Sequence, residues 1–136
     1  MNEFVLDCSI TLAWCFEDET SDYSEQILSS LSRAKAWVPA LWTVEIANAL
    51  IVAERKKRIS HVKAIAFKQQ LDLVPIKIDD YLLTKPIELI LDIAKETGLT
   101  AYDATYLELA LRKNLPISTL DKELKSAAQK VNISIW

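Results

Sequence analysis

Short apolar segments alternate with longer segments of helical spacing, and this alternation limits the folds that the chain can adopt. The apolar segments read as buried strands at residues 4–6, 36–38, 73–78, 116–120 and 132–136. Helical spacing occupies the stretches between them, at residues 9–16, 21–31, 40–57, 60–71, 84–97 and 122–130 and in a helix beginning at Thr100. Apolar strands that alternate with helices predict an α/β fold, with a parallel sheet covered on both faces. Pro75 places the third strand at an edge of that sheet.

Length and composition are those of one soluble domain. The chain has 136 residues, of which 51% are hydrophobic and 26% charged, so we expect a single domain over residues 1–136. No apolar run reaches membrane-spanning length and the N-terminus lacks a signal-peptide pattern, so we expect a cytoplasmic protein with no membrane partner.

Several classes of function are excluded by residue counts. The only glycine is Gly98, so no glycine-rich phosphate-binding loop exists. Cys8, Cys15 and His61 are too few for a zinc site, and the cysteines are read as reduced, buried small residues, with a disulfide as the alternative. A net charge of −3 argues against broad nucleic-acid binding. The segment 56–63 still offers a local basic patch, or an ordinary solvated face.

Three acids are placed where a parallel sheet binds its ligands. Asp7 ends the first strand, Asp121 ends the fourth, and Asp103 lies in the first turn of the helix that begins at Thr100. Ligands bind beyond the carboxyl ends of parallel strands, where the strand order reverses. We therefore expect these acids to meet in one crevice if the first and fourth strands are neighbours. Each also has a structural alternative as a helix cap, since Asp7 and Asp121 precede helices and Thr100 with Asp103 fits a capping box.

Glu45 is a fourth acid, in the middle of a helix that is apolar nearly all round from Leu41 to Ala53. That composition predicts a helix buried on every side. A buried carboxylate needs a partner, because desolvating it alone costs several kcal/mol. We expect Glu45 to join the other three acids; a buried pair with a Lys or Arg is the alternative.

Acids in one pocket require a cation. Two carboxylates about 4 Å apart repel by roughly 4 kcal/mol at an effective dielectric near 20. Oxygen ligands favour Mg²⁺ or Mn²⁺, which can activate water for attack on a phosphodiester. Ser9 and Thr119 each lie two residues from one of these acids and could orient them, or be ordinary surface hydroxyls.

Four segments together resemble the motifs of PIN-domain ribonucleases, specifically VapC-type toxins of toxin–antitoxin pairs. They are VLDCS at 5–9, PALWTVEIANAL at 39–50, LTAYDATYLELA at 99–110 and PISTLDKEL at 116–124. The resemblance implies an α/β/α sandwich with a five-stranded parallel sheet in the order 3-2-1-4-5. It also implies a Mg²⁺- or Mn²⁺-dependent endoribonuclease that forms a homodimer and is inhibited by a VapB-type antitoxin.

The same resemblance assigns roles to the acids. Asp7 and Asp103 correspond to the most direct metal ligands, and Glu45 and Asp121 complete the acidic pocket. The alternative is a catalytically silent PIN-like protein that acts through partner binding, whose acids are inherited caps or meet basic groups of the partner.

Overall fold

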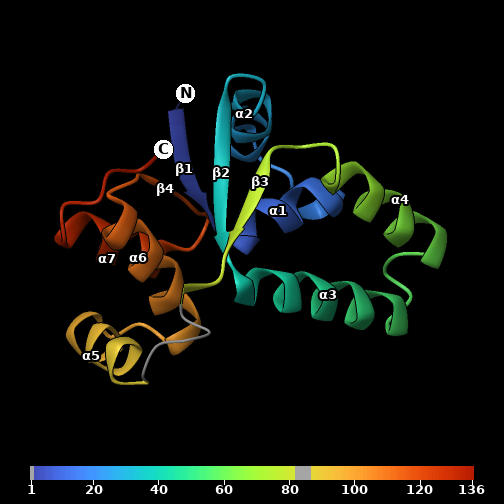
Figure 1. Cartoon of the computed structure of the whole chain (residues 1–136). Coiled ribbons are helices and arrows are strands. Elements are labelled where there is room, and N and C mark those ends of the chain that lie inside the picture. The colour runs from blue at the N-terminus through green and yellow to red at the C-terminus, as the bar shows by residue number, and fades with distance from the viewer. Residues whose placement is uncertain (1, 82–86) are drawn as a thin grey trace.

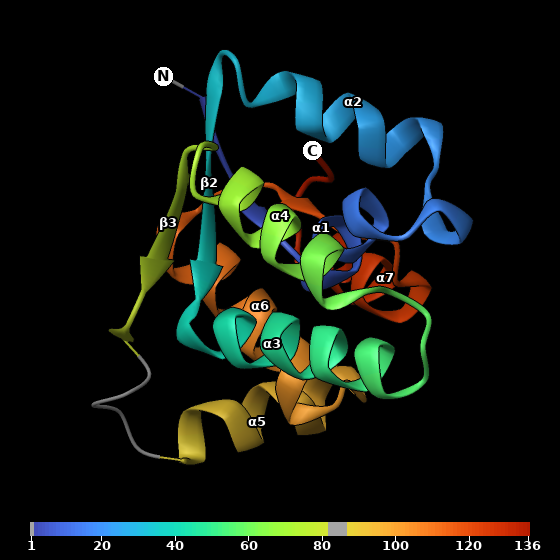
Figure 2. The ribbon, with the colours of Figure 1, turned by 90° about the vertical axis from the view of Figure 1, so that its right-hand side faces the viewer.

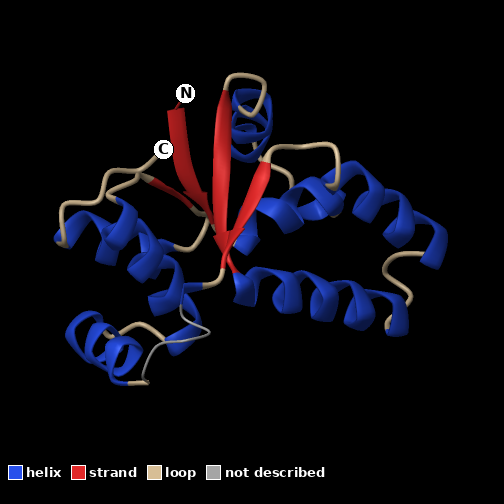
Figure 3. Ribbon diagram, in the orientation of Figure 1, coloured by secondary structure: helices blue, strands red, loops and turns tan. Residues whose placement is uncertain are grey.

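A parallel sheet of four strands in the order β3-β2-β1-β4 forms the centre of this computed structural model, which describes residues 2–81 and 87–136. Figure 3 shows the strands between two groups of helices. The strands are β1 (Asn2–Leu6), β2 (Ala34–Pro39), β3 (Ile76–Asp79) and β4 (Ile117–Ser118). β3 lies at the edge, as the proline before it predicted, and this α/β architecture with a parallel sheet confirms the expected fold class.

The helices form two groups on opposite sides of the sheet (Figure 1). One side carries α1 (Cys8–Cys15), the short 3₁₀ helix η1 (Glu17–Glu19), α2 (Asp22–Ser30) and α4 (His61–Leu71). The other side carries α6 (Ala101–Lys113) and α7 (Lys122–Lys130). Helices α3 (Ala40–Arg55) and α5 (Glu88–Thr97) lie at the level of the carboxyl ends of the strands, as Figures 1 and 2 both show. The expected first turn of the fifth long helix, at residues 84–86, lies outside the described residues.

Local capping residues explain where most helices begin and end. The side chains of Ser21, Ser60 and Thr100 accept hydrogen bonds from backbone N–H groups at the starts of α2, α4 and α6. Gly98 ends α5 with a φ of 75°, a left-handed conformation that glycine adopts without strain. These boundaries were predictable because each depends on residues within one helical turn.

The hydrophobic core lies on both faces of β1. Phe4, Val5 and Leu6 are completely buried between the two helix groups. Ile10 of α1 packs on one side, and Leu107 of α6 belongs to the same core cluster. This packing fixes the carboxyl end of β1, where the chain leaves the sheet and enters α1.

The expected fifth strand at residues 132–136 is wrong as a full strand. Only Ile135 pairs with the sheet, through a single parallel bridge to Ile117 on the outer side of β4. Asn132 has a φ of 64°, which breaks the extended backbone just before this segment. Trp136 instead anchors the segment by stacking on Phe4, with ring centroids 4.8 Å apart.

The expectation that the apolar helix is buried on every side is also wrong. Within α3 the buried residues are Trp42, Ile46 and Ala53, whereas the side chain of Val44 is 66% exposed and that of Ile51 is 46% exposed. The helix packs against α1 and α4 and extends away from the sheet (Figure 1), so part of its apolar surface is left uncovered. Its apolar composition therefore leaves an exposed apolar surface.

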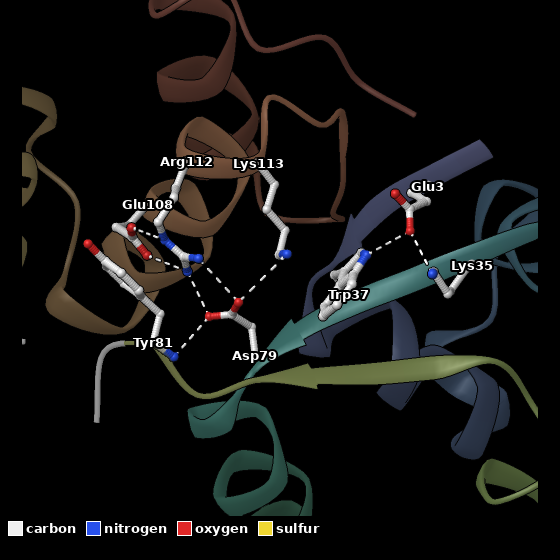
Figure 4. Close-up of polar contacts among 8 residues, drawn as sticks. All are labelled: Glu3, Lys35, Trp37, Asp79, Tyr81, Glu108, Arg112 and Lys113. Atoms are coloured by element: carbon white, nitrogen blue, oxygen red, sulfur yellow. Dashed lines mark hydrogen bonds and ion pairs between the residues drawn. The ribbon is translucent and has the colours of Figure 1, made fainter. Parts of the chain in front are cut away.

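An ion cluster joins the end of β3 to α6 (Figure 4). Arg112 donates hydrogen bonds to Asp79 at 2.7 and 3.2 Å and to Glu108 at 2.8 and 3.2 Å, and it stacks on the ring of Tyr81. Asp79 belongs to the edge strand, which is otherwise paired only with β2. The cluster therefore connects the β3 edge of the sheet to helix α6.

The two cysteines are not joined by a disulfide, and the single histidine lies on the surface. Cys8 and Cys15 are both free and half-buried, so the disulfide alternative is not realised. His61 is exposed at the start of α4 and faces Glu54, with its ring nitrogen 3.1 Å from the carboxylate. No helix in the described part of the chain has the length and apolar character needed to cross a membrane.

Candidate active site

Strands β1 and β4 lie side by side, and their carboxyl ends place two of the acids together. Val5 pairs with Ile117 and Leu6 with Ser118 in a parallel register. Asp7 follows β1 directly, and Asp121 comes three residues after β4 and begins α7. The strand order reverses between β1 and β4, which is where a ligand site is expected in an open parallel sheet.

The Asp7 carboxylate is bound by two hydroxyl groups and does not cap the helix that follows it. Its side chain is nearly buried and makes no capping hydrogen bond, although it occupies the N-cap position of α1. Ser9 and Thr119 donate to the same carboxylate oxygen, Oδ2, at 2.6 and 2.8 Å. Burial raises the pKa of Asp7 above its ordinary value, these hydrogen bonds oppose the rise, and the charge of Asp121 adds to it.

Thr119 and Ser9 also fix the backbone that follows β4. The N–H of Asp121 donates to the Thr119 hydroxyl at 3.0 Å, and the N–H of Leu120 donates to the Ser9 hydroxyl at 3.0 Å. The two hydroxyl groups therefore hold the Asp7 carboxylate and the β4–α7 connection in one network.

Asp121 and Asp103 lie at the starts of α7 and α6. The side chain of Asp121 accepts a hydrogen bond from the N–H of Leu124 at 2.9 Å, so Asp121 caps α7, as its structural alternative predicted. Asp103 donates its own N–H to the Thr100 side chain, which is half of the expected capping box. Burial, followed by the charges of Asp121 and Asp7, raises the pKa of Asp103 to about 6.

Glu45, on the second turn of α3, faces the same region from the other side. Tyr106 of α6 donates its hydroxyl to Oε1 of Glu45 at 2.6 Å. Burial raises the pKa of Glu45, and the charge of Asp7 raises it further. In residues 2–81 and 87–136, Glu45 forms no ion pair with a Lys or Arg. Its fixed partner is thus a neutral phenol.

Residues 4–130 match the PIN domain family. This chain belongs to the PIN domain family. The match covers nearly the whole sequence and includes all four acids, which confirms the family inferred from the motifs. PIN domains are typically nucleases, and the family generally uses divalent metal ions. Comparison with curated proteins gave no match.

Solved structures share this PIN fold. The structure of PAE2754 from Pyrobaculum aerophilum has a TM-score of 0.69 and 26% sequence identity, covering 93% of this chain and 79% of that one. VapBC2 from Rickettsia felis, bound to a DNA fragment from its promoter, has a TM-score of 0.65 and 12% identity, covering 98% and 96%. FitAcB from Neisseria gonorrhoeae has a TM-score of 0.61 and 17% identity, also covering 98% and 96%.

The four acids of this PIN domain influence one another's charge. Asp7, Asp121 and Glu45 each contribute to the raised pKa of Asp103, and Asp7 contributes to that of Glu45. In the described ranges, however, no three His, Cys, Asp or Glu side chains are grouped closely enough to hold a metal ion. The acids therefore lie within electrostatic reach of one another, but no three of the described side chains lie at ligand spacing. Carboxylate oxygens whose like charges repel fit a hard divalent cation, which would relieve the repulsion.

Two residues at this PIN site were missed in the sequence analysis. Tyr106 lies three residues after Asp103, and this helical spacing could have placed both on one face of α6. Cys8 was read as a small core residue, yet its half-buried thiol interacts with Tyr106 and Glu45. Burial and the charges of Asp7 and Glu45 raise the pKa of this thiol well above its ordinary value, so it stays protonated.

Proposed function

We propose that this chain is a single PIN domain over residues 1–136 that acts as a Mg²⁺- or Mn²⁺-dependent endoribonuclease. The observation that supports this proposal is the raised pKa of three acids from separate elements, Asp7, Glu45 and Asp103, to which the charges of neighbouring acids contribute near the carboxyl ends of β1 and β4. The proximity of these carboxylates destabilises the fold when no cation is bound, because their like charges repel. A cation is the partner that makes their proximity favourable.

In this proposal Asp7 and Asp103 bind the ion, and Glu45 and Asp121 complete the acidic pocket. When bound, the ion would supply an activated water and would stabilise charge on the phosphate oxygens. Ser9 and Thr119 keep Asp7 in one orientation through Oδ2. Helix α1 begins at Cys8, next to Asp7, and α6 begins at Ala101, two residues before Asp103. The partial positive charge at these helix N-termini favours both the carboxylates and an incoming phosphate.

The direct test is RNA cleavage by the Asp7→Asn variant. We expect cleavage of a mixed single-stranded RNA substrate with Mn²⁺ to fall by at least a hundredfold, and growth arrest on expression to be lost. Asp22→Asn is the matched control, because Asp22 is an exposed acid in the first turn of α2. Unchanged cleavage and growth arrest in Asp7→Asn would refute the proposal.

A thermal melt with Mn²⁺ tests the catalytically silent alternative. An ion that binds only the folded state stabilises it by about 2.7 kcal/mol at a hundredfold excess over its dissociation constant. We expect the melting temperature of the wild type to rise with Mn²⁺ and that of Asp103→Asn to stay constant. The absence of a rise in the wild type at millimolar Mn²⁺ would favour a protein that acts only by binding a partner.

We further propose that the protein is the cytoplasmic toxin of a VapBC-type pair. Two of the similar structures are named VapBC2 and FitAcB, which supports a cognate VapB-type antitoxin as partner. Co-expression of the small reading frame beside the gene should yield a complex that purifies together and no longer cleaves RNA. Failure of every adjacent small protein to bind would refute the pairing without affecting the nuclease proposal.

We also propose a homodimer that uses the exposed apolar surface of α3, α5 and α6. Val44 of α3 and Tyr102 of α6 are 66% and 63% exposed, and Leu91 of α5 is 48% exposed. A cavity of about 480 Å³, lined largely by apolar atoms, lies between α3 and α6 at this surface. Exposed apolar patches of this kind are typical of protein interfaces.

A further inference from the structure

Tyr106 connects the helix that carries Asp103 to the helix that carries Glu45. Its side chain is completely buried, and its hydroxyl donates a 2.6 Å hydrogen bond to Oε1 of Glu45. The two residues are 61 positions apart in sequence, so the bond is a tertiary contact between α6 and α3. A hydrogen bond to a carboxylate is stronger than one between neutral groups, and a short O–H···O distance is characteristic of that kind.

Glu45 needs such a contact because its own helix holds it weakly. Nearly half of the residues of α3 are exposed, including Val44 next to Glu45. A glutamate has three rotatable side-chain bonds, so a half-buried one can adopt several rotamers unless a partner selects one. Tyr106 is rigid by comparison, since its ring is fixed in the core cluster with Leu107 and Ala104.

The chemical nature of the donor matters for the site. A Lys or Arg in place of the phenol would also orient Glu45, but it would neutralise the carboxylate and compete with a cation. A phenol donates one hydrogen bond, keeps its proton and leaves the negative charge of the carboxylate in place. The bond occupies one of the two carboxylate oxygens, so Glu45 is oriented while it remains an anion.

We propose that Tyr106 is a positioning residue, whose buried hydroxyl fixes the orientation of the Glu45 carboxylate and thereby raises the affinity of the acidic site for a divalent cation. This inference rests on the proposed metal-dependent function. Asp103 and Tyr106 are three residues apart in α6 and lie on one side of that helix. A single rigid helix therefore presents one acid and sets the orientation of another. Residues that orient metal ligands in this way typically change metal affinity or activity by about 10–100-fold when they are mutated.

A double-mutant cycle tests the inference. The proteins are the wild type, Tyr106→Phe, Glu45→Gln and the double variant, and Mn²⁺ affinity is measured on metal-free protein by electron paramagnetic resonance. We expect Tyr106→Phe to weaken Mn²⁺ binding at least tenfold. We also expect no further loss in the Glu45→Gln background, because the hydroxyl acts through Glu45. In the cleavage assay, the Mn²⁺ concentration for half-maximal rate should rise for Tyr106→Phe, with a smaller change in the rate at saturating Mn²⁺.

Thr105→Val is the matched control. Thr105 also lies on α6 and donates its hydroxyl, but to the backbone carbonyl of Ala101 in its own helix at 2.8 Å. Loss of that hydroxyl should leave Mn²⁺ affinity unchanged. Circular dichroism and urea unfolding of each metal-free variant establish that it is folded before binding is compared.

The outcomes distinguish this inference from the proposed function. If Tyr106→Phe binds Mn²⁺ and cleaves RNA as the wild type does, the positioning role is refuted and the nuclease proposal stands. Equal losses in the wild-type and Glu45→Gln backgrounds would also refute it, because they indicate a packing role in the core. If the wild type itself neither binds Mn²⁺ nor cleaves RNA, the proposed function fails and this inference fails with it.

Discussion

The hydroxyl of Thr119 donates a 2.8 Å hydrogen bond to the carboxylate of Asp7 across 112 residues of sequence. The same hydroxyl accepts the N–H of Asp121 at 3.0 Å. One side chain at the end of β4 thus fixes the most buried acid and the backbone of a second acid. Because β1 and β4 are neighbours only in the folded sheet, this relationship depends on the strand order.

Thr119→Val removes this hydroxyl and keeps the shape of the side chain. We expect the free energy of unfolding to fall by about 2 kcal/mol, because a buried carboxylate loses one of its two hydroxyl donors and the Asp121 N–H loses its acceptor. Urea unfolding of the metal-free protein measures the change. Thr105→Val is the control, since the Thr105 hydroxyl bonds only its own helix at Ala101 and its loss should cost little. Equal losses in the two variants would contradict a special role for Thr119.

The stability of the metal-free protein should increase as pH falls from about 7 toward 5. The pKa of Asp103 is raised from 3.8 to about 6 in the folded protein, so the folded state binds a proton more tightly than the unfolded chain does. Protonation of Asp103 therefore stabilises the folded state as pH falls through the interval between those two values. Above the higher value Asp103 is charged in both states, and this stabilisation is lost. Urea unfolding in the presence of a chelator, at several pH values, measures this dependence.

Asp103→Asn isolates the contribution of that one carboxyl group. We expect the variant to be more stable than the wild type at pH 7 and to gain less stability on acidification. Other carboxyl groups with lowered pKa values, such as that of Asp79, act in the opposite direction. The informative quantity is therefore the difference between the two proteins at each pH, and a constant difference would contradict the raised pKa.

Arg112→Met should destabilise the protein at the β3 edge. The variant leaves Asp79 and Glu108 without their shared cation, and the Glu108 side chain is only 5% exposed. Removing one partner of a buried ion pair costs about 3–5 kcal/mol, and since this cluster is partly exposed we expect about 2 kcal/mol. Urea unfolding gives the value, with Arg33→Met as the control at an exposed arginine. A loss no larger than that of the control would show that the cluster contributes nothing to stability.

Val44→Lys should convert the proposed homodimer into a folded monomer. Val44 is 66% exposed and lines the apolar cavity between α3 and α6, where a charge would be buried by a partner subunit. Light scattering after size-exclusion chromatography, at several protein concentrations, measures the mass. Val62→Lys is the control, because Val62 on α4 is 77% exposed but lies outside that cavity. A monomeric wild type would refute the dimer, and a dimeric Val44→Lys would place its interface elsewhere.

Features that depend on neighbouring residues were determined by the sequence. Ser21, Ser60, Thr100 and Gly98 set helix boundaries within one turn of themselves, so their roles could be read directly. The alternation of apolar strands and helices predicted the parallel sheet, and the positions of Asp7 and Asp121 after two of its strands predicted acids at one edge. Each of these inferences requires only chain direction and local backbone geometry.

Features that depend on which surfaces meet were decided by the tertiary structure. The apolar composition of α3 could not reveal that part of its apolar surface stays exposed, because composition does not show which side chains a neighbouring element covers. Whether Glu45 would meet a Lys, an Arg or Tyr106 depended on how α6 packs against α3, which no local pattern encodes. The last strand shrank to one bridge at Ile135 because the backbone turns at Asn132, two residues before the pairing begins. Long-range contacts are made between segments whose separation in sequence carries no information about their distance in space, so only the packed chain could determine them.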